Sequence, residues 1–311
     1  DLPRPHPQKK EVLIKISCCG ICRTDLHVIE GDLPQPKLPL IPGHQIVGKI
    51  VELGSGAERF KIGDRVGVAW LGKTCGKCEF CKENRENLCD NGLFTGYQLN
   101  GGYAEYCSAN EDFIFPIPEG FSDIQAAPLL CAGFIGYRSY RMAKDAKNIG
   151  FYGFGSSAHI LIQIARYEGR KVFTFSRKGN QKNQDFAKKM GAYWAGDSET
   201  MPPELLDAAI IFAPVGSLIP VALKALRKGG SIICAGIHMS DIPSFPYSLL
   251  WGEREIKSVA NLTREDGEQL LELAPKIPIK TDVITYPLET ANEALKDFKE
   301  GKIEGTAVLV I

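Results

Sequence analysis

Apolar and polar residues alternate over residues 11–17, with the two-residue period of a strand that buries one face. The same pattern predicts strands over residues 46–53 and 112–118, and short strands on either side of a turn at Gly63-Asp64. Segments rich in glycine and proline separate these runs. We therefore expect the first region to be a small, strand-rich barrel with much irregular structure.

From Asn148 onward, strand-like apolar runs alternate with helical periodicity. We expect further strands over 171–176, 208–213, 231–235, 256–260 and 307–311, and helices over 133–142, 218–226, 270–274 and 291–298. Gly229-Gly230 is predicted to end the helix that precedes it. Strands that alternate with helices are typical of a parallel, doubly wound sheet, so the fold class is α/β.

The change of pattern predicts two domains in this chain of 311 residues. We place a catalytic domain at 1–132 and 268–311, because the last segment is expected to return to the first domain. A dinucleotide-binding domain is placed at 133–267.

The 37 basic residues balance the 37 acidic residues, so no attraction to nucleic acid or to an anionic membrane is expected. The chain shows no signal peptide and no apolar run of about 18 residues, which favours a cytoplasmic protein. Ten cysteines suggest either a disulfide framework, which is typical of small secreted chains, or metal ligands. We interpret six of them as ligands and Cys18, Cys19, Cys107 and Cys234 as buried thiols.

Four of the cysteines form the most specific local motif of the chain. Cys75, Cys78, Cys81 and Cys89 have the spacing C-x2-C-x2-C-x7-C, within a lobe at about residues 73–92. Four thiolates in so short a segment can enclose a tetrahedral zinc ion without an open position, which is typical of a structural site. An iron–sulfur cluster is the alternative, because it also takes four cysteines.

A second set of ligands is spread along the chain. Cys22 and His44 offer a thiolate and an imidazole, and Cys131 can supply a second thiolate once the chain folds back. Three nitrogen and sulfur ligands with an open fourth position are typical of catalytic zinc, although cobalt or iron would also suit them. Asp25 is placed to accept the ring N–H of His44, and Thr24 and His27 are placed to pass a proton to water.

The run Cys-Gly-Ile-Cys-Arg-Thr-Asp-Leu-His, followed by Gly-His-Gln, resembles the signature of the medium-chain, zinc-dependent alcohol dehydrogenases. The resemblance covers essentially the whole chain and implies a GroES-like catalytic domain, a Rossmann domain, and a homo-oligomer, either dimer or tetramer. It implies that Cys22, His44 and Cys131 hold the catalytic zinc, that Thr24 and His27 form the proton relay, and that Arg23 reaches the cofactor pyrophosphate.

The chain departs from this family at two positions and at its start. Gln45 replaces the usual Glu after the histidine, and Ile135 stands where a Thr is frequent, next to the nicotinamide. The chain starts at Asp1, and the first strand usual in the family is not found before Pro3, so we expect that the amino terminus has been trimmed.

The strand from Asn148 runs into a Gly153-x-Gly155-x-x-Ala158 turn, which includes Ser156 and leads into a helix with apolar periodicity at Ile160, Ile164 and Ala165. Such a turn lets the backbone and the helix N-terminus approach a pyrophosphate, although a plain glycine turn is the alternative reading. Ile237, at the end of a later strand, is expected to line the nicotinamide pocket.

The end of the next strand bears on which cofactor is used. Ser176 and Arg177 follow it, where NAD-binding chains carry an acid for the adenosine ribose. These residues favour the 2′-phosphate of NADP, with NAD as the alternative and a solvated Arg177 as the simpler interpretation.

We therefore predict a zinc-dependent alcohol dehydrogenase with one catalytic and one structural zinc, which moves a hydride between a small-molecule alcohol, aldehyde or ketone and NADP or NAD. A zinc-free quinone or enone reductase, or a non-catalytic cofactor-binding protein of the same fold, are the alternatives.

Overall fold

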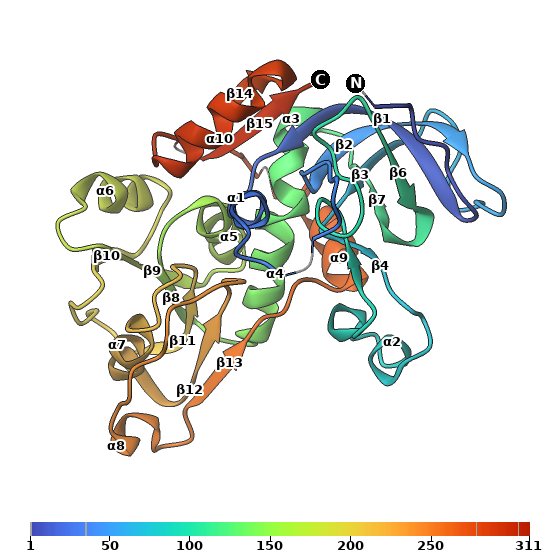
Figure 1. Ribbon diagram of the computed structural model, residues 1–311. Helices are drawn as coiled ribbons and strands as arrows, with labels where there is room; N and C mark the ends of the chain where they lie inside the picture. The colour runs from blue at the N-terminus through green and yellow to red at the C-terminus, as the bar shows by residue number, and fades with distance from the viewer. Residues whose placement is uncertain (1, 35, 278, 304) are drawn as a thin grey trace. The chain divides into compact units, whose positions relative to one another are not determined.

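The computed structural model describes residues 2–34, 36–277, 279–303 and 305–311 (Figure 1). The chain forms two compact units, one with residues up to Phe134 and from Asn261 to Ile311, the other with Ile135–Ala260. These units meet after residues 134 and 260, whereas the sequence predicted domain boundaries after residues 132 and 267. The assignment of catalytic and cofactor-binding roles to these parts remains a prediction.

The first unit is built on a sheet of seven strands in the order β14-β15-β1-β2-β3-β7, with β6 also paired to β1. All of its pairs are antiparallel except β14 with β15. The strands are β1 (Glu11–Gly20), β2 (Gln45–Leu53), β3 (Arg65–Val68), β6 (Tyr106–Asn110), β7 (Ile114–Pro116), β14 (Val283–Pro287) and β15 (Thr306–Val310). The last segment of the chain, Asn261–Ile311, returns to this unit, where β15 pairs with β1.

Strand β1 lies at the centre of this sheet, because it pairs with β2, β6 and β15. Val12, Ile14 and Ile16 are buried, as their alternation with polar residues predicts. The strand is longer than the expected range 11–17, because Cys18, Cys19 and Gly20 pair with β15 on one side and β2 on the other.

Short helices and a small lobe complete the first unit. The helices are α1 (Arg23–Glu30), α3 (Asp123–Ala126), α9 (Arg264–Leu273) and α10 (Ala291–Lys299), with 3-10 turns η2 (Glu111–Phe113), η3 (Ala127–Leu130) and η4 (Leu288–Thr290). The lobe contains β4 (Leu71–Lys73), α2 (Glu79–Lys82), η1 (Glu86–Leu88) and β5 (Leu93–Phe94). Helix α4 (Ala132–Met142) leads from this unit into the second.

The second unit is a six-stranded, fully parallel sheet in the order β10-β9-β8-β11-β12-β13. The strands are β8 (Asn148–Tyr152), β9 (Lys171–Ser176), β10 (Trp194–Asp197), β11 (Leu206–Ile211), β12 (Leu226–Cys234) and β13 (Glu255–Ser258), and the helices are α5 (Ser156–Tyr167), α6 (Gln181–Lys189), α7 (Leu218–Ala225) and α8 (Tyr247–Leu250). The chain order reverses between β8 and β11. In such sheets, ligands bind at the carboxyl ends of the strands beside this reversal.

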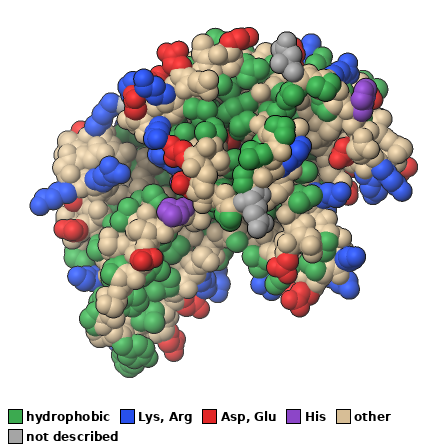
Figure 2. Space-filling model, in the orientation of Figure 1, with side chains coloured by type: hydrophobic (Ala, Val, Ile, Leu, Met, Phe, Trp, Pro, Cys, Tyr) green, Lys and Arg blue, Asp and Glu red, His purple; other side chains and the backbone are tan. Residues whose placement is uncertain are grey.

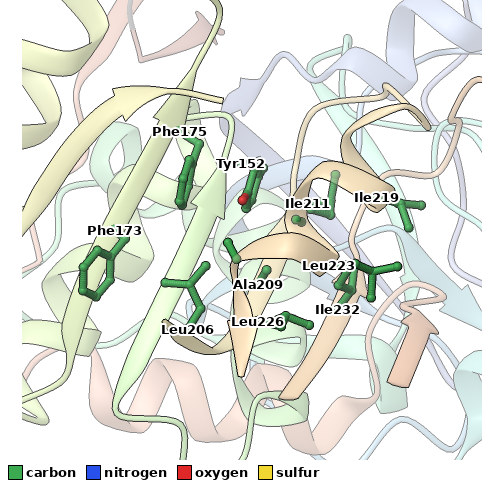
Figure 3. Close-up of a cluster of buried hydrophobic side chains, with 12 residues drawn as sticks. Tyr152, Phe173, Phe175, Leu206, Ala209, Ile211, Ile219, Leu223, Leu226 and Ile232 are labelled. Carbon is green, nitrogen blue, oxygen red and sulfur yellow. The ribbon is translucent and has the colours of Figure 1, made fainter. Parts of the chain in front are cut away.

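A cluster of buried side chains from β8, β9, β11, α7 and β12 fills the core beneath this sheet (Figure 3). The rings of Tyr152 and Phe175 stack with their centroids 4.0 Å apart and their planes 2° from parallel. Tyr152 is the last residue of β8 and Phe175 the last but one of β9, so their packing fixes the strand ends from which the next loops start.

Two predicted details were wrong. Gly229-Gly230 does not end a helix, because α7 ends at Ala225 and extended backbone at Leu226 already starts β12. Gly229 instead takes φ +71° within the β12 segment, where its N–H donates to the carbonyl of Gly252. Only part of the range 112–118 is a strand, because Asn110 caps a 3-10 turn before β7 by accepting the N–H of Asp112.

Basic and acidic side chains are interspersed on the face shown in Figure 2, without a large patch of either sign. No helix in the described ranges is long and apolar enough to cross a membrane.

Candidate functional site

Cys22, His44 and Cys131 meet in the first unit, with their ligand atoms all within 4.8 Å of one another. The two sulfur atoms are 3.6 Å apart. Cys22 lies at the N-cap of α1, directly after β1, while His44 precedes β2 and Cys131 lies between η3 and α4. The structure thus brings together the three residues that the sequence predicted as one ligand set.

Asp25 holds this group in place from a buried position. Its Oδ2 accepts the N–H of Cys22 at 2.8 Å, and its Oδ1 accepts the N–H of Gly43 at 3.2 Å. The same Oδ1 lies 3.1 Å from Nδ1 of His44, which confirms the contact expected from the sequence. Nδ1 is therefore the donor, and the ring presents Nε2 to the two thiols.

The other ring nitrogen of His44 supports a metal site. Nε2 is buried and has no hydrogen-bond partner among the described residues. A buried polar atom is almost always paired, and an imidazole whose other nitrogen is held by a carboxylate is the common form of a metal ligand. One nitrogen and two sulfur atoms suit zinc, so the residues present fit the ion that the motif implies.

The local charges favour a cation at this position. A hydrogen bond from Cys131 lowers the pKa of Cys22 well below its usual range, against the effect of burial and with further help from His44. The same contact raises the pKa of the Cys131 thiol. Burial alone would lower the pKa of His44, but Asp25 and Cys22 raise it to about 10 in the metal-free chain. Metal binding would therefore displace protons from this group.

Thr24 and His27 lie on α1, beside the ligand group. Thr24 Oγ1 is 3.7 Å from the Cys22 sulfur. His27 Nδ1 is 2.8 Å from Oδ2 of Asp32, and the side chain of His27 is 15% exposed while that of Asp32 is 50% exposed. The sequence analysis did not identify Asp32 as a partner of His27. Gly31 ends the helix in a left-handed conformation, and the position of Asp32 directly after it could have indicated this contact.

The other residues named around this site lie as follows. Arg23 is exposed, with its guanidinium 5.3 Å from the ring centre of Phe298. Gln45 is buried, and its Oε1 has no partner among the described residues. Ile135 is half-buried on α4, where its carbonyl accepts the hydroxyl of Ser139 at 2.7 Å.

Cys75, Cys78, Cys81 and Cys89 form the second group, also with all four sulfur atoms within 4.8 Å. The N–H of Cys75 donates to the Cys89 sulfur at 3.5 Å, and the N–H of Cys78 donates to the Cys75 sulfur at 3.4 Å. Backbone hydrogen bonds from Lys77 and Cys78 to its sulfur lower the pKa of Cys75 to about 6. The four thiols therefore fit a closed metal site that stabilises the lobe.

An ion pair with a buried carboxylate ties this lobe to α9, and the sequence did not indicate it. Glu86, which is 3% exposed, accepts the backbone N–H of Arg264 at 2.9 Å and its Nε at 3.1 Å. Because Glu86 lies three positions before Cys89, the lobe and the start of α9 support each other.

A cavity of about 790 Å³ lies in the second unit at the carboxyl ends of the strands. It is lined by the predicted Gly153, Gly155, Ser176 and Arg177. Ser156 begins α5 but is not among its lining residues. Ile237 is not among them either and is 55% exposed, so its role stays a prediction.

The turn after β8 fits a nucleotide phosphate. Gly153 has φ +94°, which favours glycine. Gly155 caps α5, and a Cβ added there would project into open space with no atom within 4 Å. The helix N-terminus thus faces the cavity across bare backbone, as a pyrophosphate requires.

Several lining residues were missed from the sequence. They are Lys178, Asn180 and Asn183 after β9, and Asp197, Ser198, Glu199 and Thr200 at and after the end of β10. Their position after parallel strands was the available signal, since such ends meet at one edge of the sheet.

The four remaining cysteines belong to neither of these two groups. Cys18, Cys19 and Cys107 are buried, as predicted, whereas Cys234 is only half-buried. Burial raises the pKa of Cys18 and of Cys107 to about 12, so these thiols stay protonated at neutral pH.

Residues 8–119 match the family model described as "Alcohol dehydrogenase GroES-like domain". The chain is 45% identical over 319 residues to "Probable alcohol dehydrogenase AdhA" of Mycobacterium tuberculosis (strain CDC 1551 / Oshkosh), which covers 100% of this chain and 91% of that protein. The chain belongs to the medium-chain alcohol dehydrogenase family. It is accordingly an oxidoreductase with a GroES-like domain and a Rossmann domain.

Solved structures of this family have the same fold. One is CAD from Helicobacter pylori complexed with NADP(H), with a TM-score of 0.87, 26% identity, and coverage of 98% of this chain and 91% of that one. Another is acetophenone reductase from Geotrichum candidum NBRC 4597 in complex with NAD, with a TM-score of 0.89, 26% identity, and coverage of 100% and 92%.

Proposed function

We propose that this alcohol dehydrogenase uses one catalytic zinc ion, held by Cys22, His44 and Cys131, and one structural zinc ion, held by Cys75, Cys78, Cys81 and Cys89. The observation that carries the proposal is the buried, unpartnered Nε2 of His44, which points to an ion between the imidazole and two thiols. Zinc with an open position supplies a Lewis acid for an alcohol or carbonyl oxygen, and the nicotinamide cofactor supplies the hydride chemistry.

The residues of α1 have the remaining task of moving a proton. Thr24 Oγ1 lies beside the Cys22 sulfur and is placed to accept the proton of a substrate hydroxyl. His27 then takes the proton toward solvent, because Asp32 holds its Nδ1 at 2.8 Å and orients the ring. The half-exposed Asp32 places the end of this relay at the surface.

We favour NADP(H) as the cofactor, with NAD(H) as the alternative. Arg177 and Lys178 bring two positive charges to the cavity directly after β9, and the Ser176 hydroxyl lies beside them. The run Ser176-Arg177-Lys178 contains no carboxylate to accept the ribose hydroxyls, and a guanidinium suits a phosphate. The relatives with bound cofactor include one complex with NADP(H) and one with NAD, so both choices occur on this fold.

We propose a small-molecule alcohol, aldehyde or ketone as the substrate.

We propose a dimer or tetramer as the assembly. Two features support an interface between copies. Strand β13 is an edge strand of its sheet, and Tyr247 and Trp251, in the segment before it, are 72% and 60% exposed. Light scattering during size-exclusion chromatography measures the assembly.

The ten free cysteines agree with a reducing, cytoplasmic compartment.

The zinc assignment is tested with Cys22→Ser, measured for zinc content and for alcohol oxidation. We expect zinc to fall from two ions to one per chain and turnover to be lost, with the second ion retained by the lobe. Cys234→Ser, a thiol outside both groups, is the matched control and should keep two ions and full activity. Full activity of Cys22→Ser with one bound ion would refute the catalytic site.

A further inference from the structure

One side chain of α6 connects the ends of two strands at the cofactor cavity. Gln184 Nε2 donates to Oγ of Ser176, at the end of β9, at 3.1 Å. It also donates to Oδ1 of Asp197, at the end of β10, at 2.9 Å. Asp197 Oδ1 accepts in addition the backbone N–H of Gly179 at 3.0 Å. The backbone on both sides of Arg177 and Lys178 is therefore anchored through Gln184 and Asp197.

The neighbouring residue of α6 makes a third connection. Asn183 Nδ2 donates to the carbonyl of Phe154, in the glycine turn after β8, at 3.2 Å. Asn180 caps the helix by accepting the N–H of Asn183 at 3.2 Å. The first turn of α6 thus joins the carboxyl ends of β8, β9 and β10, and Asn180 and Asn183 line the cavity themselves.

The contacts of Asp197 bear on which cofactor is accepted. Asp197 lines the cavity, and a carboxylate there is the kind of group that accepts the ribose hydroxyls of NAD and repels a 2′-phosphate. In this chain its Oδ1 already accepts two N–H groups, which turn that oxygen toward the protein. Arg177 and Lys178 are exposed in the same cavity.

We propose that Gln184 is a positioning residue for cofactor selectivity. Together with the N–H of Gly179 it occupies Oδ1 of Asp197, so that this oxygen is not free to accept a ribose hydroxyl, and it keeps the segment Ser176–Lys178 in the conformation that receives a 2′-phosphate. This inference rests on the proposed preference for NADP(H).

The test compares Gln184→Leu with Gln181→Leu in the full chain. Gln181 is an exposed glutamine of the same helix that bonds to Asp185 instead, so its variant is a matched control. The dissociation constants of NADPH and NADH are measured by fluorescence titration. We expect Gln184→Leu to weaken NADPH binding about tenfold while NADH binding changes by less than about twofold, and Gln181→Leu to change neither.

A second measurement needs no cofactor. Hydrogen exchange of the Gly179 amide in the cofactor-free chain should be faster in Gln184→Leu than in Gln181→Leu, because the acceptor Asp197 loses its second donor. Melting curves confirm that the variants are folded. If Gln184→Leu does not fold, Gln184→Glu, which has the same length but cannot donate, replaces it with the same expected loss of selectivity.

Arg177→Ala separates the two claims. The selectivity is the dissociation constant of NADH divided by that of NADPH. If the wild-type chain binds NADH more tightly than NADPH, or if Arg177→Ala leaves this selectivity unchanged, the proposed cofactor preference fails and the inference fails with it. If Arg177→Ala lowers the selectivity but a folded Gln184 variant keeps it, only the positioning role is overturned.

Discussion

His44 Nδ1 and Asp25 Oδ1 are 3.1 Å apart, and both side chains are 1% exposed. Asp25 also accepts the N–H groups of Cys22 and Gly43, so one buried carboxylate fixes the backbone of the first ligand and the ring of the second. Since the imidazole cannot turn without breaking this contact, Nε2 is held toward the thiols before any ion arrives.

Replacing Asp25 with Asn should weaken zinc binding at the Cys22 group by about 10- to 100-fold, which is the usual effect of losing a partner behind a histidine ligand. Competition with a chromogenic chelator measures the affinity of each ion. Asp32→Asn is the control, because Asp32 contacts His27 and no member of the ligand set. Equal zinc affinity in Asp25→Asn and the wild-type chain would show that His44 does not need this support.

Replacing His27 with Asn should lower the rate of alcohol oxidation by up to about 10²-fold, because the proton then lacks a group that passes it to water. Added imidazole buffer should restore part of the rate, whereas the zinc content should remain at two ions. A variant with unchanged turnover, or one that imidazole does not rescue, would place the proton path elsewhere.

Replacing Cys78 with Ser should release the ion of the lobe and destabilise the chain, since a structural metal contributes several kcal/mol to folding. Elemental analysis should find one zinc ion, and the melting temperature should fall. Cys234→Ser should keep both zinc ions and a melting temperature close to that of the wild-type chain. An iron signal with visible absorbance from the lobe would instead support an iron–sulfur cluster.

Asp207 should make the second unit sensitive to acid. Burial by itself raises the pKa of this carboxyl, but the N–H groups of Asn148 and Lys147, at 2.8 and 2.6 Å, and the guanidinium of Arg227 outweigh it and hold the pKa below 3.8. The stabilisation is thus present above pH 3.8 and is lost as the pH falls through the lower folded value.

Asp207→Asn should therefore lower the free energy of unfolding at pH 7 by about 1–3 kcal/mol, and this difference from the wild-type chain should shrink below about pH 4. Urea titrations at a series of pH values measure it. Asp185→Asn, an exposed site on α6, is the control. A difference that stays constant down to pH 2 would contradict the role given to the carboxylate.

Much of the fold was readable from local patterns, because strand alternation and helix periodicity depend on neighbours in sequence. The buried alternation of β1, the glycine turn after β8 and the parallel strands of the second unit were predicted in this way. The boundary at Leu226 was not, since glycines usually end helices, and only the pairing of Leu226 and Ser231 with β11, on either side of Gly229, reveals that this glycine lies within β12.

The sequence by itself determined the chemical types of the two ligand groups, because cysteine and histidine at these spacings have few other uses. Only the family resemblance grouped Cys131 with Cys22, 109 positions away, and nothing in the sequence joined Gln184 to Asp197. Those contacts exist only once the sheets have formed and their strand ends converge, since the packing of distant segments, and not their spacing along the chain, sets which polar atoms meet.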